Sequence, residues 1–251
     1  MATVQPNLNR SAPLIYGIQE YYQIKPVDGL NGPKTRAAIQ EIGTLDITKI
    51  KLEYRLMEII GCFEMGPYHK NLWYATSTID DGAGKNYGFM QMNKFGSLQI
   101  MKKLYAYTDA DSFFSSKACI EPQIEYFKRY ILDRVVKFGF INDNDLLTKC
   151  DSLVQNGVMT PSRAPRSYED WRLGDELLKQ VKAEYAKNNF KTAFLNCLPM
   201  HEHMYAELMP RSGVPKFISD MLSRRRCTDY GHGKVHGENY DLSLFGFNVE
   251  D

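Results

Sequence analysis

Three carboxylates stand in settings of different polarity, and such a contrast can support acid–base chemistry. Glu64 ends an apolar stripe, following Met57 and Ile60 at helical spacing. Asp80 and Asp81 belong to the glycine-rich run DDGAG, which predicts a polar, open turn. An apolar setting favours the protonated form of a carboxyl group, and a wet setting favours the ionised form. Cleavage of a glycosidic bond needs both: an acid for the leaving oxygen and an anion that activates water or supports positive charge.

A helix and a hairpin must position these groups. The run ITKIKLEYRLMEIIGCFE predicts a helix capped by Asp46 and ending at Glu64, with Arg55 among the residues that suit water. WYATSTI and YGFMQMN predict two short strands around the DDGAG turn. Further helices are expected near 97–105, 121–138, 142–155, 167–186 and 214–226. The chain is therefore expected to be mainly α (α+β) with one small sheet.

The first 45 residues are expected to form a separate small unit. PLIYGIQEYYQI and PKTRAAIQ predict two short helices on either side of a loop with the pattern DGxxGPxT. This arrangement resembles the peptidoglycan-binding module of many cell-wall hydrolases, although Leu30 replaces the usual aromatic residue. A plain helix-turn-helix packed on its neighbour is the alternative. The resemblance divides the chain into residues 1–45 and 46–251, and it assigns wall binding to Asp28, Gly29, Gly32 and Thr35.

A second resemblance covers the rest of the chain. The run DGAGKNYGFMQMN, from Asp81 to Asn93, resembles the motif DGxGxSxGxxQxN of bacterial and phage endolysin-like proteins related to family 46 chitosanases. Residues 150–164 and 222–247 resemble a helix end and the C-terminal tail of the same family, in the same order. The resemblance implies a lysozyme-like, bilobal helical domain with a small β-hairpin sheet. It also implies an inverting mechanism with Glu64 as general acid and Asp81 as general base, while Asp80 stays open as the base.

Several polar residues near the motif are candidates for substrate contact. Asn86 stands where relatives often carry a hydroxyl residue that helps to hold the nucleophilic water. Gln91 and Asn93 alternate with methionines, so both amides face the cleft if the methionines face the core. Tyr87 can stack on a sugar ring or belong to the core. The substrate-binding candidates are Asp80, Asn86, Tyr87, Gln91 and Asn93.

Other chemically capable side chains have less specific patterns. Arg224, Arg225 and Arg226 could hold an anionic peptidoglycan group, cap a helix end, or form an internal ion pair with an aspartate. The pairs His201/His203 and His232/His236 lack an HExxH pattern or cysteine partners, and the glycines around His232 predict a loop. The five scattered cysteines predict buried, reduced thiols. We therefore expect neither a metal ion nor a cofactor.

Charge and hydropathy narrow the function class. The formal net charge of +1 gives no electrostatic argument for nucleic acid, and no apolar run approaches the roughly 20 residues that span a bilayer. The run MATVQPNLNRSAP shows no secretory signal. Together with these exclusions, the two resemblances imply a peptidoglycan hydrolase of the endolysin type, expected to be a monomer made in a host cytoplasm and released to the wall. A lytic transglycosylase, a chitosanase and a non-catalytic wall-binding or virion structural protein remain alternatives.

Overall fold

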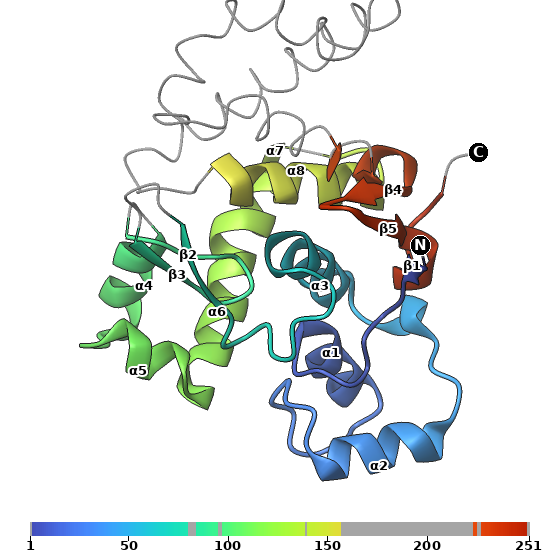
Figure 1. Ribbon diagram of the computed structural model, residues 1–251, viewed down its shortest axis with the longest axis horizontal. Coiled ribbons are helices and arrows are strands. Elements are labelled where there is room, and N and C mark those ends of the chain that lie inside the picture. Colours follow the sequence, from blue (N-terminus) through green and yellow to red (C-terminus); the bar gives the residue numbers. More distant parts are fainter. Residues whose placement is uncertain are drawn as a thin grey trace, which may run out of the picture.

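The computed structural model describes residues 2–79, 84–94, 97–138, 140–156, 223–224 and 227–249, and these are mainly helical (Figure 1). The α-helices of these ranges are α1 (Pro13–Tyr21), α2 (Pro33–Ile42), α3 (Leu52–Met65), α4 (Ser97–Tyr105), α5 (Ala110–Phe114), α6 (Ile120–Tyr126), α7 (Asp133–Phe138) and α8 (Asp143–Asn156). A π-helical segment, η3 (Phe127–Leu132), joins α6 to α7. The shorter turns are the 3₁₀ segments η1 (Ile47–Lys49), η2 (Lys117–Cys119) and η5 (Leu242–Phe245). The prediction of a mainly α (α+β) chain is confirmed.

The predicted helices near 97–105 and 142–155 are confirmed as α4 and α8. The predicted helix over 121–138 is divided into α6, η3 and α7. Those expected near 167–186 and over 214–222 lie outside the described residues. None of the helices within the described ranges has the length and apolar character that crossing a bilayer would need.

Two small sheets accompany the helices. Strands β2 (Thr76–Ile79) and β3 (Gly84–Tyr87) form the expected antiparallel hairpin, with Ser77 opposite Asn86. The predicted strand YGFMQMN is wrong beyond Tyr87, because residues 88–91 form a turn that returns the chain to pair Tyr87 with Met92. The second sheet was not predicted; its order is β1 (Thr3–Val4), β5 (Glu238–Asp241), β4 (His232–Val235). Strand β1 runs parallel to β5, so the N-terminal end of the chain lies beside its C-terminal part (Figure 1).

Helix α3 forms the centre of the hydrophobic core. Its residues 54–63 are all buried, and it packs against α1 and α8 (Figure 1). The helix begins later than predicted, because the Asp46 carboxylate accepts a hydrogen bond from Thr48 N (3.0 Å) and so caps η1 instead. Arg55 does not face water as expected. Its side chain is buried and donates hydrogen bonds to the carbonyl oxygens of Ile50 and Gly246.

A buried ion pair joins the N-terminal segment to α3. The side chains of Arg10 and Glu58 are 1% and 0% exposed, and Arg10 Nε donates to Glu58 Oε1 at 3.1 Å. The backbone N–H of Leu14 donates to the other oxygen of Glu58 at 3.1 Å. Residues near the start of α1 therefore complete the polar contacts of the central helix. The division into residues 1–45 and 46–251 stays a prediction.

Candidate active site

Glu64 lies in the last turn of α3, where it shares an arginine with a second carboxylate. Arg224 Nη2 donates to Glu64 Oε1 at 2.7 Å and to Asp151 Oδ1, on α8, at 2.9 Å. The Arg224 guanidinium also lies over the ring of Phe63, 5.3 Å from its centroid. Of the interpretations of Arg224, the internal ion pair with an aspartate is confirmed. Three segments far apart in sequence thus meet at the end of the central helix.

The three side chains differ in their access to solvent. The Arg224 and Asp151 side chains are 3% and 7% exposed, whereas Glu64 retains 16% of its surface. The apolar setting expected for Glu64 is only part of its environment, because a cation also holds it. Glu64 is the member of this cluster that a ligand can reach.

The aspartates expected to face Glu64, Asp80 and Asp81, lie outside the described residues. The strands on either side of them, β2 and β3, are described and form the predicted hairpin. Their roles as base and substrate contact therefore stay predictions. Arg225 and Arg226 also lie outside the described residues.

The amides near the end of the hairpin bind one another. Asn86 Nδ2 donates to Ser77 Oγ at 3.3 Å, and Ser77 Oγ in turn donates to Gln91 Oε1. Gln91 Nε2 donates to Gly88 O at 2.8 Å. Asn86 is 3% exposed, and its Oδ1 has no hydrogen-bond partner among the described residues. Sequence reasoning missed Ser77, although a residue nine positions before Asn86 is a cross-strand neighbour in a hairpin of this length.

The alternation argument for Gln91 is wrong, because this residue lies in the turn at φ +49°, after β3 has ended. The two neighbouring methionines are buried, as the argument assumed. The backbone N–H of Asn93 donates to Ser97 Oγ at 3.1 Å, just before α4. Substrate contacts by these amides stay a prediction.

Tyr87 belongs to the core. Its side chain is 7% exposed, and its ring lies 5.1 Å from that of Phe114. The hydroxyl group donates to Asp111 Oδ1 at 3.0 Å. Burial, reinforced by this hydrogen bond, raises the pKa of Tyr87 to about 12. Of the two interpretations of Tyr87, the structure favours packing over an exposed stacking face.

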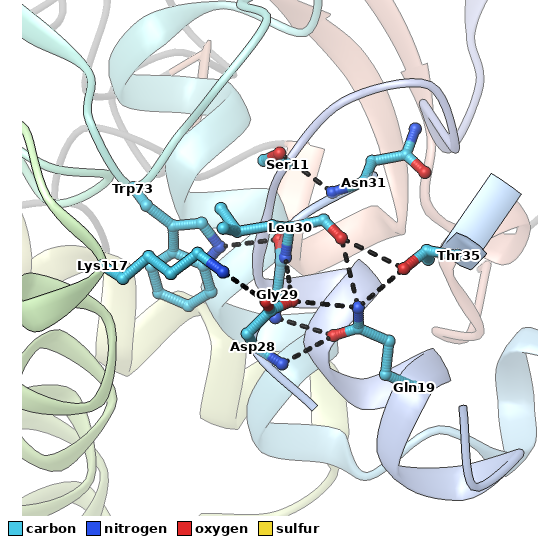
Figure 2. Close-up of polar contacts among 9 residues, drawn as sticks. All are labelled: Ser11, Gln19, Asp28, Gly29, Leu30, Asn31, Thr35, Trp73 and Lys117. Atoms are coloured by element: carbon cyan, nitrogen blue, oxygen red, sulfur yellow. Dashed lines mark hydrogen bonds and ion pairs between the residues drawn. The ribbon is translucent and has the colours of Figure 1, made fainter. Parts of the chain in front are cut away.

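The loop with the wall-binding pattern is organised by a buried glutamine that sequence reasoning missed (Figure 2). Gln19 Oε1 accepts from the backbone N–H groups of Asp28 (3.0 Å) and Gly29 (2.7 Å). Its Nε2 donates to Leu30 O (3.1 Å) and Thr35 Oγ1 (3.0 Å). Gly32 precedes Pro33 at the start of α2, and its carbonyl accepts the first helical hydrogen bond. Asp28 and Thr35 thus hold the loop in its conformation.

The remaining candidates show no further centre within the described residues. His201 and His203 lie outside them, and His232 begins β4, so the loop predicted there is wrong for this residue. No group of three or more potential metal ligands occurs among the residues that the structure describes. Four of the cysteines are described, and all four are buried with raised thiol pKa values, chiefly because of burial.

No family model matches the chain, and neither a curated protein nor a solved structure shows significant similarity to it. The interpretation of the site therefore depends on the residues themselves and on the motif resemblances described above.

Proposed function

We propose that this chain hydrolyses the glycan strands of bacterial peptidoglycan, with Glu64 as general acid and Asp81 as general base of an inverting reaction. The observation that carries the proposal is the position of Glu64 in the last turn of a buried helix. Its carboxylate pairs with Arg224 and still has 16% of its side-chain surface exposed to solvent. The hairpin that the motif resemblance requires supports it as well. A lysozyme-like, bilobal arrangement of the catalytic domain is part of this proposal.

The exposures of the three side chains favour Glu64 as the group that meets the glycan. Arg224 and Asp151 are 3% and 7% exposed, whereas Glu64 retains 16% of its surface. General acid catalysis requires a side chain that can come within hydrogen-bond reach of the glycosidic oxygen, and in this proposal Glu64 is that side chain.

The bond changes in the proposed reaction are those of an inverting glycosidase. Glu64 gives its proton to the glycosidic oxygen as the bond from the anomeric carbon to that oxygen breaks. Asp81 takes a proton from water on the opposite face, and the water oxygen bonds to the anomeric carbon. The negative charge that appears on Glu64 is stabilised by Arg224, which is already in place at 2.7 Å.

The proposal includes a setting for the enzyme. The chain acts as a monomer on the cell wall, without membrane insertion, after release from the host cytoplasm in which it is made. Exposed groups of its first 45 residues contact the insoluble polymer, because tethering raises the local substrate concentration at a weakly binding cleft.

Analysis of the fragments released from purified sacculi tests this function. We expect the unchanged chain to release products with reducing ends, and Glu64→Gln to lower the rate by about 10²- to 10⁴-fold. Asp81→Asn should lower it similarly, and a larger loss in Asp80→Asn than in Asp81→Asn would instead make Asp80 the base. A proton NMR time course of a soluble glycan should show the inverted anomer first.

Each alternative gives a different outcome in the same experiment. Anhydro-sugar ends together with full activity of Asp81→Asn would identify a lytic transglycosylase. Cleavage of chitosan in preference to sacculi would identify a chitosanase. Equal clearing of cell walls by the unchanged chain and by Glu64→Gln would leave Glu64 without a catalytic role.

A further inference from the structure

We infer that residues 28–35 hold Trp73 in place, and with it the segment that leads into β2, which we call the root of the β2–β3 hairpin. Residues that the sequence assigned to wall binding therefore position the hairpin of the proposed active site. The inference goes beyond the proposed function, and its activity test rests on that function. The polar side chains of Gln19, Asp28 and Thr35 bind other residues of this chain (Figure 2).

The polar atoms of Asp28 and Thr35 already bind other groups of this chain. Asp28 Oδ1 accepts from Leu30 N (3.1 Å) and Gln19 Nε2 (3.2 Å), and Asp28 Oδ2 pairs with Lys117 Nζ at 3.1 Å. Thr35 is 2% exposed, and its hydroxyl group binds Gln19 and donates to Leu30 O at 3.2 Å. These side chains therefore have little capacity left for a polymer outside.

The loop meets Trp73 at a contact that only glycine allows. The indole N–H of Trp73, which is 0% exposed, donates to Gly29 O at 3.1 Å. Gly29 has φ +67°, and a Cβ atom there would lie 2.6 Å from Trp73 Nε1. Figure 2 shows Gly29 held between Gln19 on one side and Trp73 on the other. Gln19 thus holds the N–H of Gly29, while the carbonyl oxygen of the same residue accepts from the indole and, at 3.1 Å, from the backbone N–H of Ala12.

Trp73 in turn belongs to the root of the hairpin, three residues before Thr76 begins β2. Its carbonyl oxygen accepts from Gln123 Nε2 on α6 at 3.0 Å. Gln123 Oε1 accepts from the backbone N–H of Phe89, just after β3, at 3.3 Å. Gln123 therefore joins Trp73, in the segment before β2, to the residues that follow β3. Residues 28–35 fix the side that contains Trp73.

The consequence for catalysis is mechanical. A shift of Trp73 tilts β2, which ends at Ile79, two positions before Asp81 in the chain. A displacement of about 1 Å at a reacting group can lower a rate about 10²-fold. Gln19, Thr35 and Trp73 are positioning residues in this scheme, since they act through the hairpin and do not touch the glycan.

Two kinds of substrate separate positioning from wall binding. Gln19→Leu removes the centre of the loop network, Thr35→Val is a milder, isosteric change, and Gln40→Leu on the exposed face of α2 is the matched control. We expect Gln19→Leu to lower kcat about tenfold or more, both on soluble glycan oligomers and on sacculi, with KM within about twofold. Thr35→Val should change kcat in the same direction by less, and Gln40→Leu should leave it unchanged. A loss confined to sacculi, or an unchanged kcat, would overturn the inference.

Hydrogen exchange gives a readout that needs no activity. In the folded Thr35→Val variant, the Trp73 indole N–H and the amides of residues 76–79 and 84–87 should exchange about threefold or more faster than in the control. Equal exchange in both variants would refute the coupling. If the unchanged chain cleaves no glycan but the exchange rates differ as expected, the proposed function fails while the coupling stands.

Discussion

Removing the positive charge of Arg10 should destabilise the whole chain. Arg10→Leu leaves the Glu58 carboxylate 0% exposed with no cation, and it also removes the donor to Pro67 O, bonded at 2.8 Å. An unpaired buried charge of this kind costs about 3–5 kcal/mol. With a urea dependence of about 3 kcal/mol per molar, the unfolding midpoint should fall by about 1.0–1.7 M. Circular dichroism at increasing urea measures this shift.

A double variant separates the charge from the packing. Arg10→Leu/Glu58→Leu removes both charges and keeps apolar volume, so it should be less destabilised than Arg10→Leu by about 1 kcal/mol or more. Lys51→Leu, which removes an exposed partner of Glu20, is the control and should change the midpoint little. An Arg10→Leu midpoint close to that of the unchanged chain would refute the reasoning, because Glu58 would then have another source of compensation.

Three further outcomes follow from the contacts described above. Asp151→Asn removes a carboxylate that holds the Arg224 guanidinium at 2.9 Å, so the guanidinium that contacts Glu64 is positioned less firmly. The initial rate of glycan cleavage should therefore fall about tenfold or more while circular dichroism stays native. Burial raises the pKa of the Cys62 thiol to about 11, so iodoacetamide at pH 8 should leave this residue unlabelled until urea is added. Peptide mapping detects the label, and labelling of Cys62 in the native chain would contradict its buried position. The pKa of Asp111 is lowered from 3.8 by hydrogen bonds from Lys85 and Tyr87. The stabilising contribution of this carboxylate is therefore present above pH 3.8 and lost as the pH falls through the lowered pKa. Melting curves from pH 6 to 2 should show a smaller fall in Tm for Asp111→Asn than for the unchanged chain.

Several elements could be predicted because their signals are local. The Gly-rich turn between β-branched segments specifies the β2–β3 hairpin, and apolar spacing specifies α3, α4 and α8. The same signals do not distinguish the hydrogen-bond pattern of an α-helix from that of a 3₁₀- or π-helix. Asp46 caps a 3₁₀ turn where an α-helix was expected, and residues 127–132 form a π-helix within one apolar repeat.

By itself, the sequence determined that Glu64 ends an apolar helix and that a polar hairpin follows it, since both depend on spacing within a few residues. Only the tertiary structure decided the partners of the buried polar groups. Arg224 reaches Glu64 across 160 positions and Arg10 reaches Glu58 across 48, and β1 pairs with β5 from the other end of the chain. No local pattern specifies such contacts, because they form only when packing brings distant elements together. A charge or a backbone polar group that is buried in this way must be paired, and its partner comes from whichever element lies beside it.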